Sequence, residues 1–164
     1  MTPLRCHDGA VDGVVEGIFT AAAAGEPMRS HTSAELVAGL GIPGDRYATG
    51  QGHWSDPRWP DQELTLVEAE LLEDLGLTMD GLRRNIVTRG IDLEEAVGCD
   101  LVVGTAVLRA VRPCEPCRYI ETLTRPGLFA ELRGHGGVRA AVLRGGVIRV
   151  GDGITALKPL REPG

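Results

Sequence analysis

The sequence predicts a mainly β fold with short helices, most simply closed on itself as a barrel. Glycine is abundant, at 23 of 164 residues, and 10 prolines add further chain reversals. Short runs rich in valine, isoleucine and leucine lie between these turn residues, as is typical of short strands. The sequence shows no internal repeat, no domain linker and no long block of helical periodicity, so we expect one domain.

Composition and charge exclude several classes of protein. Hydrophobic residues make up 43% of the chain and charged residues 24%, as in globular proteins. The net charge of −6 argues against a nucleic-acid or membrane surface. No apolar run reaches the length of a bilayer span, and the first residues lack the apolar core of a signal peptide. Four cysteines with a single close pair do not resemble a disulfide framework, so we expect a cytoplasmic protein.

The first elements follow a polar segment, residues 1–13, which we expect to be flexible. Val14–Phe19 is predicted to be a strand, and Gly17 inside it indicates a bulge or a close backbone approach. Gly41–Gly50 reads as a turn, with Asp45–Ala48 predicted to begin another strand.

The middle of the chain is predicted to hold a loop, a strand and a helix. Gln51–Gln62 lacks periodicity and reads as a surface loop. Glu63–Leu66 is predicted to be a short strand that leads into a helix ending near Leu75. Thr65 and Glu68 have the spacing of a capping box for that helix.

The second half is predicted to be richer in strands. The predicted strands are Asn85–Thr88, Leu101–Val103, Thr105–Val111, Val138–Leu143, Val147–Val150 and Ile154–Leu157. The predicted short helices are Leu93–Val97, Arg118–Leu123 and Gly127–Arg133. Gly145 and Gly146 predict a hairpin between the two strands on either side of them. The single domain is expected to span residues 14–157, followed by a tail at 158–164.

Two thiols one helical turn apart are the most informative feature of the sequence. Cys114 and Cys117 follow Pro113, which lacks an N–H and should end the preceding strand. Arg112 and Arg118 flank the pair, and nearby cations favour the thiolate form. A soft ligand pair beside positive charge, at the end of a strand, is suited to a soft metal.

The CxxC pattern by itself leaves other interpretations open. A structural zinc site usually needs four ligands, and the other cysteines and histidines show no second paired spacing. A thioredoxin-like dithiol usually lies in a βαβ fold, which this chain lacks. Two buried structural thiols remain the simplest alternative, because free cysteines are often buried.

A second group of residues is basic. Arg46 lies in the predicted turn, and Arg83 and Arg84 precede Asn85 at the start of a predicted strand. Arginine binds phosphate bidentately, and asparagine adds a directed donor. A soft metal and a phosphate in one site suggest a metal-bearing organic phosphate.

Six segments in this order resemble the MOSC family, which is named for the C-terminal domain of the molybdenum cofactor sulfurase. The segments are GLGIPGDRY (Gly39–Tyr47), LTLVEAE (Leu64–Glu70), LRRNIVTRGIDL (Leu82–Leu93), VGTAVL (Val103–Leu108), PCEPCR (Pro113–Arg118) and GGVIRVGDGI (Gly145–Ile154). The resemblance covers most of the chain and is closest to the compact single-domain members.

The resemblance implies a β-barrel that holds the molybdenum cofactor, molybdopterin, through its metal and its phosphate. In the amidoxime-reducing branch, the second cysteine of the CxxC ligates the metal, and Cys117 occupies that position here. The chain departs from that branch at Arg84, where the branch has proline, and after Cys117, where an Asp-Pro motif is missing. The expected cofactor-binding residues are Arg46, Arg83, Arg84, Asn85, Thr88 and Arg118.

Three functions follow from this reading. The first is a molybdenum oxidoreductase, with Cys117 as its catalytic metal ligand, that reduces N–O bonds in small molecules. It would take electrons from a separate reductase, because the sequence carries no electron-relay motif. The second is a carrier that holds the cofactor or a sulfur atom on Cys117. The third is a protein with zinc or a plain thiol pair. A family-level association with pyridoxal phosphate also comes with the resemblance.

Overall fold

A computed structural model describes residues 12–49, 63–114, 126–127 and 136–157. Its centre is a closed β-barrel, as the sequence predicts, and the barrel has seven strands. In order around the barrel, these are β1 (Gly13–Thr20), β10 (Gly153–Leu157), β6 (Asp100–Val103), β7 (Ala106–Pro113), β8 (Val138–Arg144), β4 (Leu64–Glu68) and β5 (Ile86–Arg89). The barrel closes because β1 pairs with β5 along one edge and with β10 along the other.

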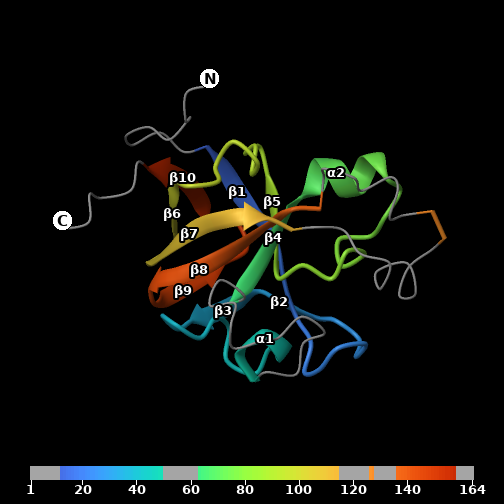
Figure 1. Cartoon of the computed structure of the whole chain (residues 1–164), viewed down its shortest axis with the longest axis horizontal. Coiled ribbons are helices and arrows are strands. Elements are labelled where there is room, and N and C mark those ends of the chain that lie inside the picture. Colours follow the sequence, from blue (N-terminus) through green and yellow to red (C-terminus); the bar gives the residue numbers. More distant parts are fainter. Residues whose placement is uncertain (1–11, 50–62, 115–125, 128–135, 158–164) are drawn as a thin grey trace.

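The remaining described elements are short and lie around this barrel (Figure 1). β2 (Arg29–His31) pairs with β1, and β3 (Ser33–Leu36) pairs with β9 (Gly146–Arg149) in a separate two-stranded sheet. Two short helices, α1 (Arg46–Thr49) and α2 (Ala69–Asp74), lie on opposite sides of the barrel.

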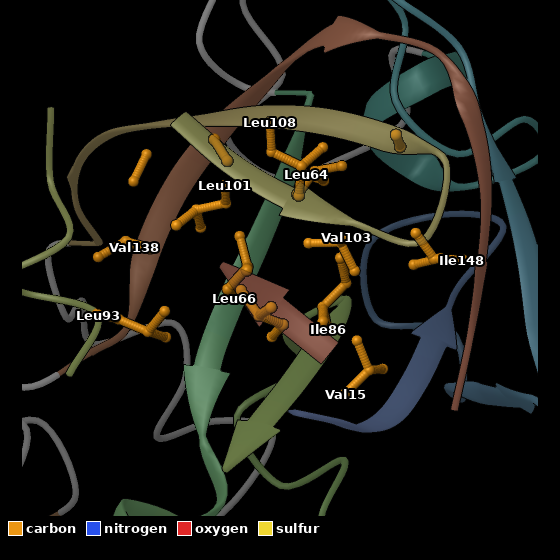
Figure 2. Close-up of a cluster of buried hydrophobic side chains, with 14 of the residues drawn as sticks. Val15, Leu64, Leu66, Ile86, Leu93, Leu101, Val103, Leu108, Val138 and Ile148 are labelled. Atoms are coloured by element: carbon orange, nitrogen blue, oxygen red, sulfur yellow. The ribbon is translucent and has the colours of Figure 1, made fainter. Parts of the chain in front are cut away.

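Alternating apolar side chains fill the barrel interior. Leu64 and Leu66 of β4 point inward with side chains from β6, β7, β8 and β5, as Figure 2 shows. Both leucines are fully buried, as are Leu101, Leu108 and Ile86. Because successive side chains of a strand face opposite sides of a sheet, Thr65, which lies between Leu64 and Leu66, faces outward.

A second, smaller cluster lies on the outer face of the same strands. Val67 of β4 and Val87 of β5 pack there against Leu72 of α2 and Leu82. β4 and β5 are parallel neighbours, so the chain between them must cross over, and α2 lies in that crossover. The crossover brings residues 83–85 back to the start of β5, beside the start of β4.

The structure confirms several predicted elements. β1 has a register shift between Val15 and Gly17, and a Cβ at Gly17 would lie only 2.7 Å from the ring of Phe19. β6 and β7 form the predicted pair on either side of Gly104, and β7 ends at Pro113.

Two predictions near the middle of the chain were wrong. Asp45–Ala48 does not begin a strand, because the Asp45 carboxylate accepts the Tyr47 N–H at 3.2 Å and starts α1. Thr65 does not cap α2, since it lies within β4. The N-cap residue of α2 is Glu68, which makes no side-chain capping bond.

The predicted hairpin around Gly145 and Gly146 was also wrong. β8 pairs with β4 and β7, whereas β9 leaves the barrel to pair with β3. A Cβ at Gly145 would lie 2.8 Å from the carbonyl oxygen of Leu36, and one at Gly146 would lie 2.5 Å from the Thr105 hydroxyl. The glycine pair therefore allows close chain crossing instead of a tight turn. Leu93–Val97, predicted to be helical, forms turns.

The remaining structural predictions lie outside the described residues. They concern the flexible segment 1–13 almost entirely, the loop Gln51–Gln62, the helices at Arg118–Leu123 and Gly127–Arg133, and the tail. No helix in the described part of the chain is both long and apolar enough to cross a bilayer.

Candidate functional site

A row of four polar side chains crosses four neighbouring barrel strands. In the strand register, Arg112 of β7 lies opposite Arg139 of β8, and Arg139 lies opposite Thr65 of β4. Asn85, at the start of β5, completes the row through a bond from its N–H to the Thr65 carbonyl oxygen at 3.1 Å. Because the neighbours Leu64, Leu66, Val138 and Ala140 fill the interior, Thr65 and Arg139 face outward.

Asn85 is fully buried and ties three strands together. Its Oδ1 accepts the Thr65 N–H at 3.0 Å and the Thr65 hydroxyl at 3.3 Å. Its Nδ2 donates to the carbonyl oxygen of Phe19 in β1 at 3.1 Å. In this arrangement the asparagine amide links β1 to β4 at one end of the row.

The Asp45–Arg46 pair is bonded to the backbone that leads into this row. Asp45 is fully buried, and Arg46 retains only 4% exposure. Nη1 of Arg46 donates to Asp45 at 3.0 Å, and Nη2 donates to the carbonyl oxygen of Arg83 at 2.6 Å. The Asp45 carboxylate also accepts the Ala21 N–H at 3.1 Å. Among the described residues, the guanidinium of Arg46 is therefore bonded to the protein's own groups, and it also stacks over the Tyr47 ring.

Arg83 and Arg84 bring this region to the start of the CxxC segment. Arg83 has a left-handed backbone, with φ of 59°, held between Arg46 and the carbonyl oxygen of Asp80. Nε of Arg84 donates to the carbonyl oxygen of Gly136 at 2.9 Å. The N–H of Cys114 donates to the carbonyl oxygen of the next residue, Gly137, at 2.8 Å.

Glycine is required at positions 136 and 137, where the chain passes close to Cys114 and to β4. A Cβ at Gly136 would lie 2.6 Å from the carbonyl oxygen of Cys114, and one at Gly137 would lie 2.1 Å from that of Leu66. The same Cβ at Gly136 would lie 3.5 Å from Nη2 of Arg84. The guanidinium of Arg84 and the backbone of Cys114 therefore approach the same glycine.

The cysteines have different environments. Cys114 is a free thiol with 2% exposure. Cys99 is buried and disulfide-bonded, which the sequence did not lead us to expect. Cys117 and Arg118, the predicted metal ligand and its neighbour, lie outside the described residues. Within the described ranges, no three His, Cys, Asp or Glu side chains are grouped as a metal-binding set.

Arg139 is a site residue that the sequence analysis missed. It retains 6% exposure, and no described residue accepts a hydrogen bond from its Nε or Nη1. In the sequence, Arg139 is a single arginine inside the apolar run VRAAVL, and such a residue is typical of an ordinary outward-facing strand position. The register of β4, β7 and β8 places Arg139 between Arg112 and Thr65. These strands are far apart in sequence, so the sequence alone does not show this arrangement.

Two carboxyl groups of the β4 region have raised pKa values. Burial raises the pKa of Glu63, although it accepts the Val142 N–H at 2.8 Å. Burial also raises the pKa of Glu68 to about 7, with further repulsion from Asp92, Glu70 and Glu94. Thr88 lies opposite Glu68 in the register and is fully buried. Its hydroxyl donates to the carbonyl oxygen of Val67 at 3.5 Å.

The structure thus gathers part of the predicted site. Arg46, Arg83, Arg84 and Asn85 lie in one connected network, and that network reaches Cys114 through the glycine pair. Thr88 lies further along β5. What these residues bind stays a prediction.

Comparisons with known proteins agree with the fold. A model of the MOSC domain matches residues 59–155. The crystal structure of the YuaD protein from Bacillus subtilis is similar, with a TM-score of 0.69 and 20% identity over 87% of this chain and 93% of that chain. YiiM from Escherichia coli gives a TM-score of 0.63 and 15% identity over 91% of this chain and 72% of that chain. Identities this low show the fold alone, and no curated protein sequence matches the chain.

Proposed function

This chain belongs to the MOSC domain family, and on that premise we propose that it binds the molybdenum cofactor. The family is known to bind this cofactor. The observation that supports the proposal here is the meeting of Arg84 and Cys114 at Gly136 and Gly137. It joins a basic segment and the start of a CxxC, which are 30 residues apart by their numbering.

The donor chemistry of the described residues fits the two ends of the cofactor. A phosphate needs charged forks, and Arg139 has buried N–H groups that no described residue accepts. A molybdenum centre needs soft ligands, and the free thiol of Cys114 marks the segment that would supply them. We assign the metal-ligating thiolate to Cys117, as the resemblance implies, with Cys114 in support.

The residues of the network divide into two roles in this proposal. Arg83, Arg84 and Arg118 are the cations offered to the cofactor's phosphate. Arg46 and Asn85 act as positioning residues, because their side chains are bonded to the backbone that carries Arg83 and to β1 and β4. Thr88, whose hydroxyl is directed to Val67, is kept as a weaker candidate.

When bound, the cofactor would supply two-electron chemistry at an oxygen atom. The protein's part is to hold the metal through a fixed thiolate and the phosphate through arginine. We further propose that the substrates are N-hydroxylated small molecules and that electrons come from a separate reductase. The motive is the resemblance to the amidoxime-reducing branch, together with the lack of an electron-relay motif in the sequence.

Molybdenum content tests the binding proposal. Protein made in a host that synthesises the cofactor should contain close to one molybdenum per chain, measured by elemental analysis. Cys117→Ala should lose the metal, because the ligating thiolate is removed, whereas Cys114→Ala should keep most of it. Equal loss in both variants would indicate a chelating thiol pair, as in zinc binding, and absence of molybdenum from the wild-type protein would refute the proposal.

Turnover separates an enzyme from a carrier. The metal-loaded protein is supplied with reduced methyl viologen and benzamidoxime, and Cys117→Ala is the control. Reduction well above the control is expected for an oxidoreductase. A fully loaded protein that reduces none of a range of N-hydroxylated compounds would be assigned to the carrier function instead.

A further inference from the structure

Arg139 is buried, and neither its Nε nor its Nη1 has a hydrogen-bond acceptor among the described residues. No other described arginine leaves both of these nitrogens buried without an acceptor. A guanidinium keeps its charge at any physiological pH, so it cannot adapt to burial by losing a proton. Buried charges in folded proteins are otherwise paired, because an uncompensated buried charge is costly. The natural complement of such a group is an anion that the protein binds.

The neighbours of Arg139 supply more positive charge and no carboxylate partner. Arg112 lies directly opposite it on β7, and like charges at such a position destabilise a sheet. On its other side is Thr65, whose hydroxyl is engaged with Asn85. The carboxyl group of Glu63, the residue before β4, accepts the Val142 N–H, and no ion pair joins it to Arg139 among the described residues.

The position of Arg139 connects it to the rest of the site. It is three residues after Gly136, the glycine that Arg84 holds and Cys114 approaches. β7, β8 and β4 run side by side in Figure 1, so the row from Arg112 to Asn85 is one continuous strip of the outer face. The strip begins beside the CxxC segment and ends beside Arg84.

We propose that Arg139 is the central oxyanion-binding residue of this strip and that its ligand is a phosphate group. A guanidinium presents Nε–H and Nη–H in the fork that matches two phosphate oxygens. The proposal deepens the proposed function, because the cofactor's own phosphate is one source of such a group. A phosphorylated small molecule is the other source.

Phosphate binding to the apo-protein tests the proposal without molybdenum. Inorganic phosphate is titrated into the full chain at constant ionic strength, with calorimetry for Kd and thermal melting for Tm. Arg139→Gln should weaken phosphate binding at least tenfold, and Arg139→Lys should weaken it less, since it keeps the charge without the fork. Arg144→Gln, an exposed arginine at the end of the same strand, is the matched control and should bind as the wild type does.

The melting temperature without phosphate distinguishes a binding role of Arg139 from a structural role, because the two roles predict opposite shifts in Arg139→Gln. Arg139→Gln should melt at or above the wild-type temperature, because it removes an uncompensated charge. A clear fall would mean that Arg139 has an internal partner and would overturn the proposal. So would a phosphate Kd that is the same in Arg139→Gln and the wild type.

Cofactor-loaded protein distinguishes the two sources. If the cofactor's phosphate occupies Arg139, the loaded wild type will no longer show Arg139-dependent phosphate binding. If the ligand is a separate phosphorylated molecule, that binding will persist in the loaded protein. Phosphate binding in a protein that takes up no molybdenum would refute the proposed function and leave this inference intact. Normal molybdenum content with no Arg139-dependent phosphate binding would support the proposed function and refute this inference.

Discussion

Arg46 and Arg139 are almost equally buried, at 4% and 6% exposure, yet their surroundings are opposite. Arg46 gives one nitrogen to the Asp45 carboxylate and another to the carbonyl oxygen of Arg83. Arg139 faces another arginine, and its Nε and Nη1 meet no acceptor among the described residues. The difference shows that burial alone does not identify a binding residue. An arginine with internal partners stabilises the fold, whereas a buried arginine without them is a candidate for binding an anion.

The largest expected effect comes from breaking the satisfied pair. Arg46→Ala leaves the Asp45 carboxylate buried without its cation and frees the carbonyl oxygen of Arg83. The free energy of unfolding should fall by about 3 kcal/mol, at the lower end for a broken buried pair, since Asp45 keeps two backbone donors. Urea denaturation measures this, with the exposed Arg149→Ala as the control. A loss below about 1 kcal/mol, as for an exposed ion pair, would show that the Arg46 pair does not stabilise the fold as proposed.

Asn85 gives the next largest effect and sharpens the contrast. Asn85→Ala deprives the buried Thr65 N–H and the Phe19 carbonyl oxygen of their partners. We expect a loss of about 1–3 kcal/mol in the free energy of unfolding. If Asn85 is a positioning residue, cofactor retention should fall less in this variant than in Arg83→Ala. Equal stability of the variant and the wild type would show that the amide is not needed to join the strands.

Glu68 extends the comparison to a half-buried group that can lose its charge. Its folded pKa of about 7 lies above the usual 4.5, so the native state binds the proton more tightly than the unfolded chain does. The stability that Glu68 contributes is therefore fully present below pH 4.5 and is lost as the pH rises through about 7. The loss attributable to Glu68 should be on the order of 1–2 kcal/mol after solvent screening.

Denaturation at pH 5 and pH 8 measures the Glu68 contribution. Glu68→Gln should reduce the difference in unfolding free energy between the two pH values. The exposed Glu35→Gln should leave that difference unchanged. An undiminished difference in Glu68→Gln would assign the pH dependence to other groups.

Much of the fold was predictable because its signals are local. Gly17 predicted the bulge in β1, since a side chain there would meet Phe19. Pro113 predicted the end of β7, because proline cannot donate to the ladder. The hairpin around Gly145 failed for the opposite reason: β9 pairs with β3, more than a hundred residues earlier by their numbering.

The candidate site was only partly predictable for the same reason. Arg83, Arg84 and Asn85 form one short basic segment, and their residue types already indicate phosphate binding. The internal partners of Arg46 and Asn85 come from distant strands, so sequence could not show that these side chains are already occupied. Arg139 has no local motif at all, and only the register of three strands places it among the other arginines.

The closure of the barrel by β1 and β10 also has a consequence for folding. Gly13 pairs with Ile154, and the Ala156 N–H donates to the Asp12 carboxylate across 144 residues of chain. Pairings this distant in sequence raise the contact order, and folding slows accordingly. During synthesis β1 must wait for β10, so the early strands stay exposed at an unpaired edge that other chains can add to. For this topology, the interval between making the first strand and the last is the period of greatest exposure to aggregation.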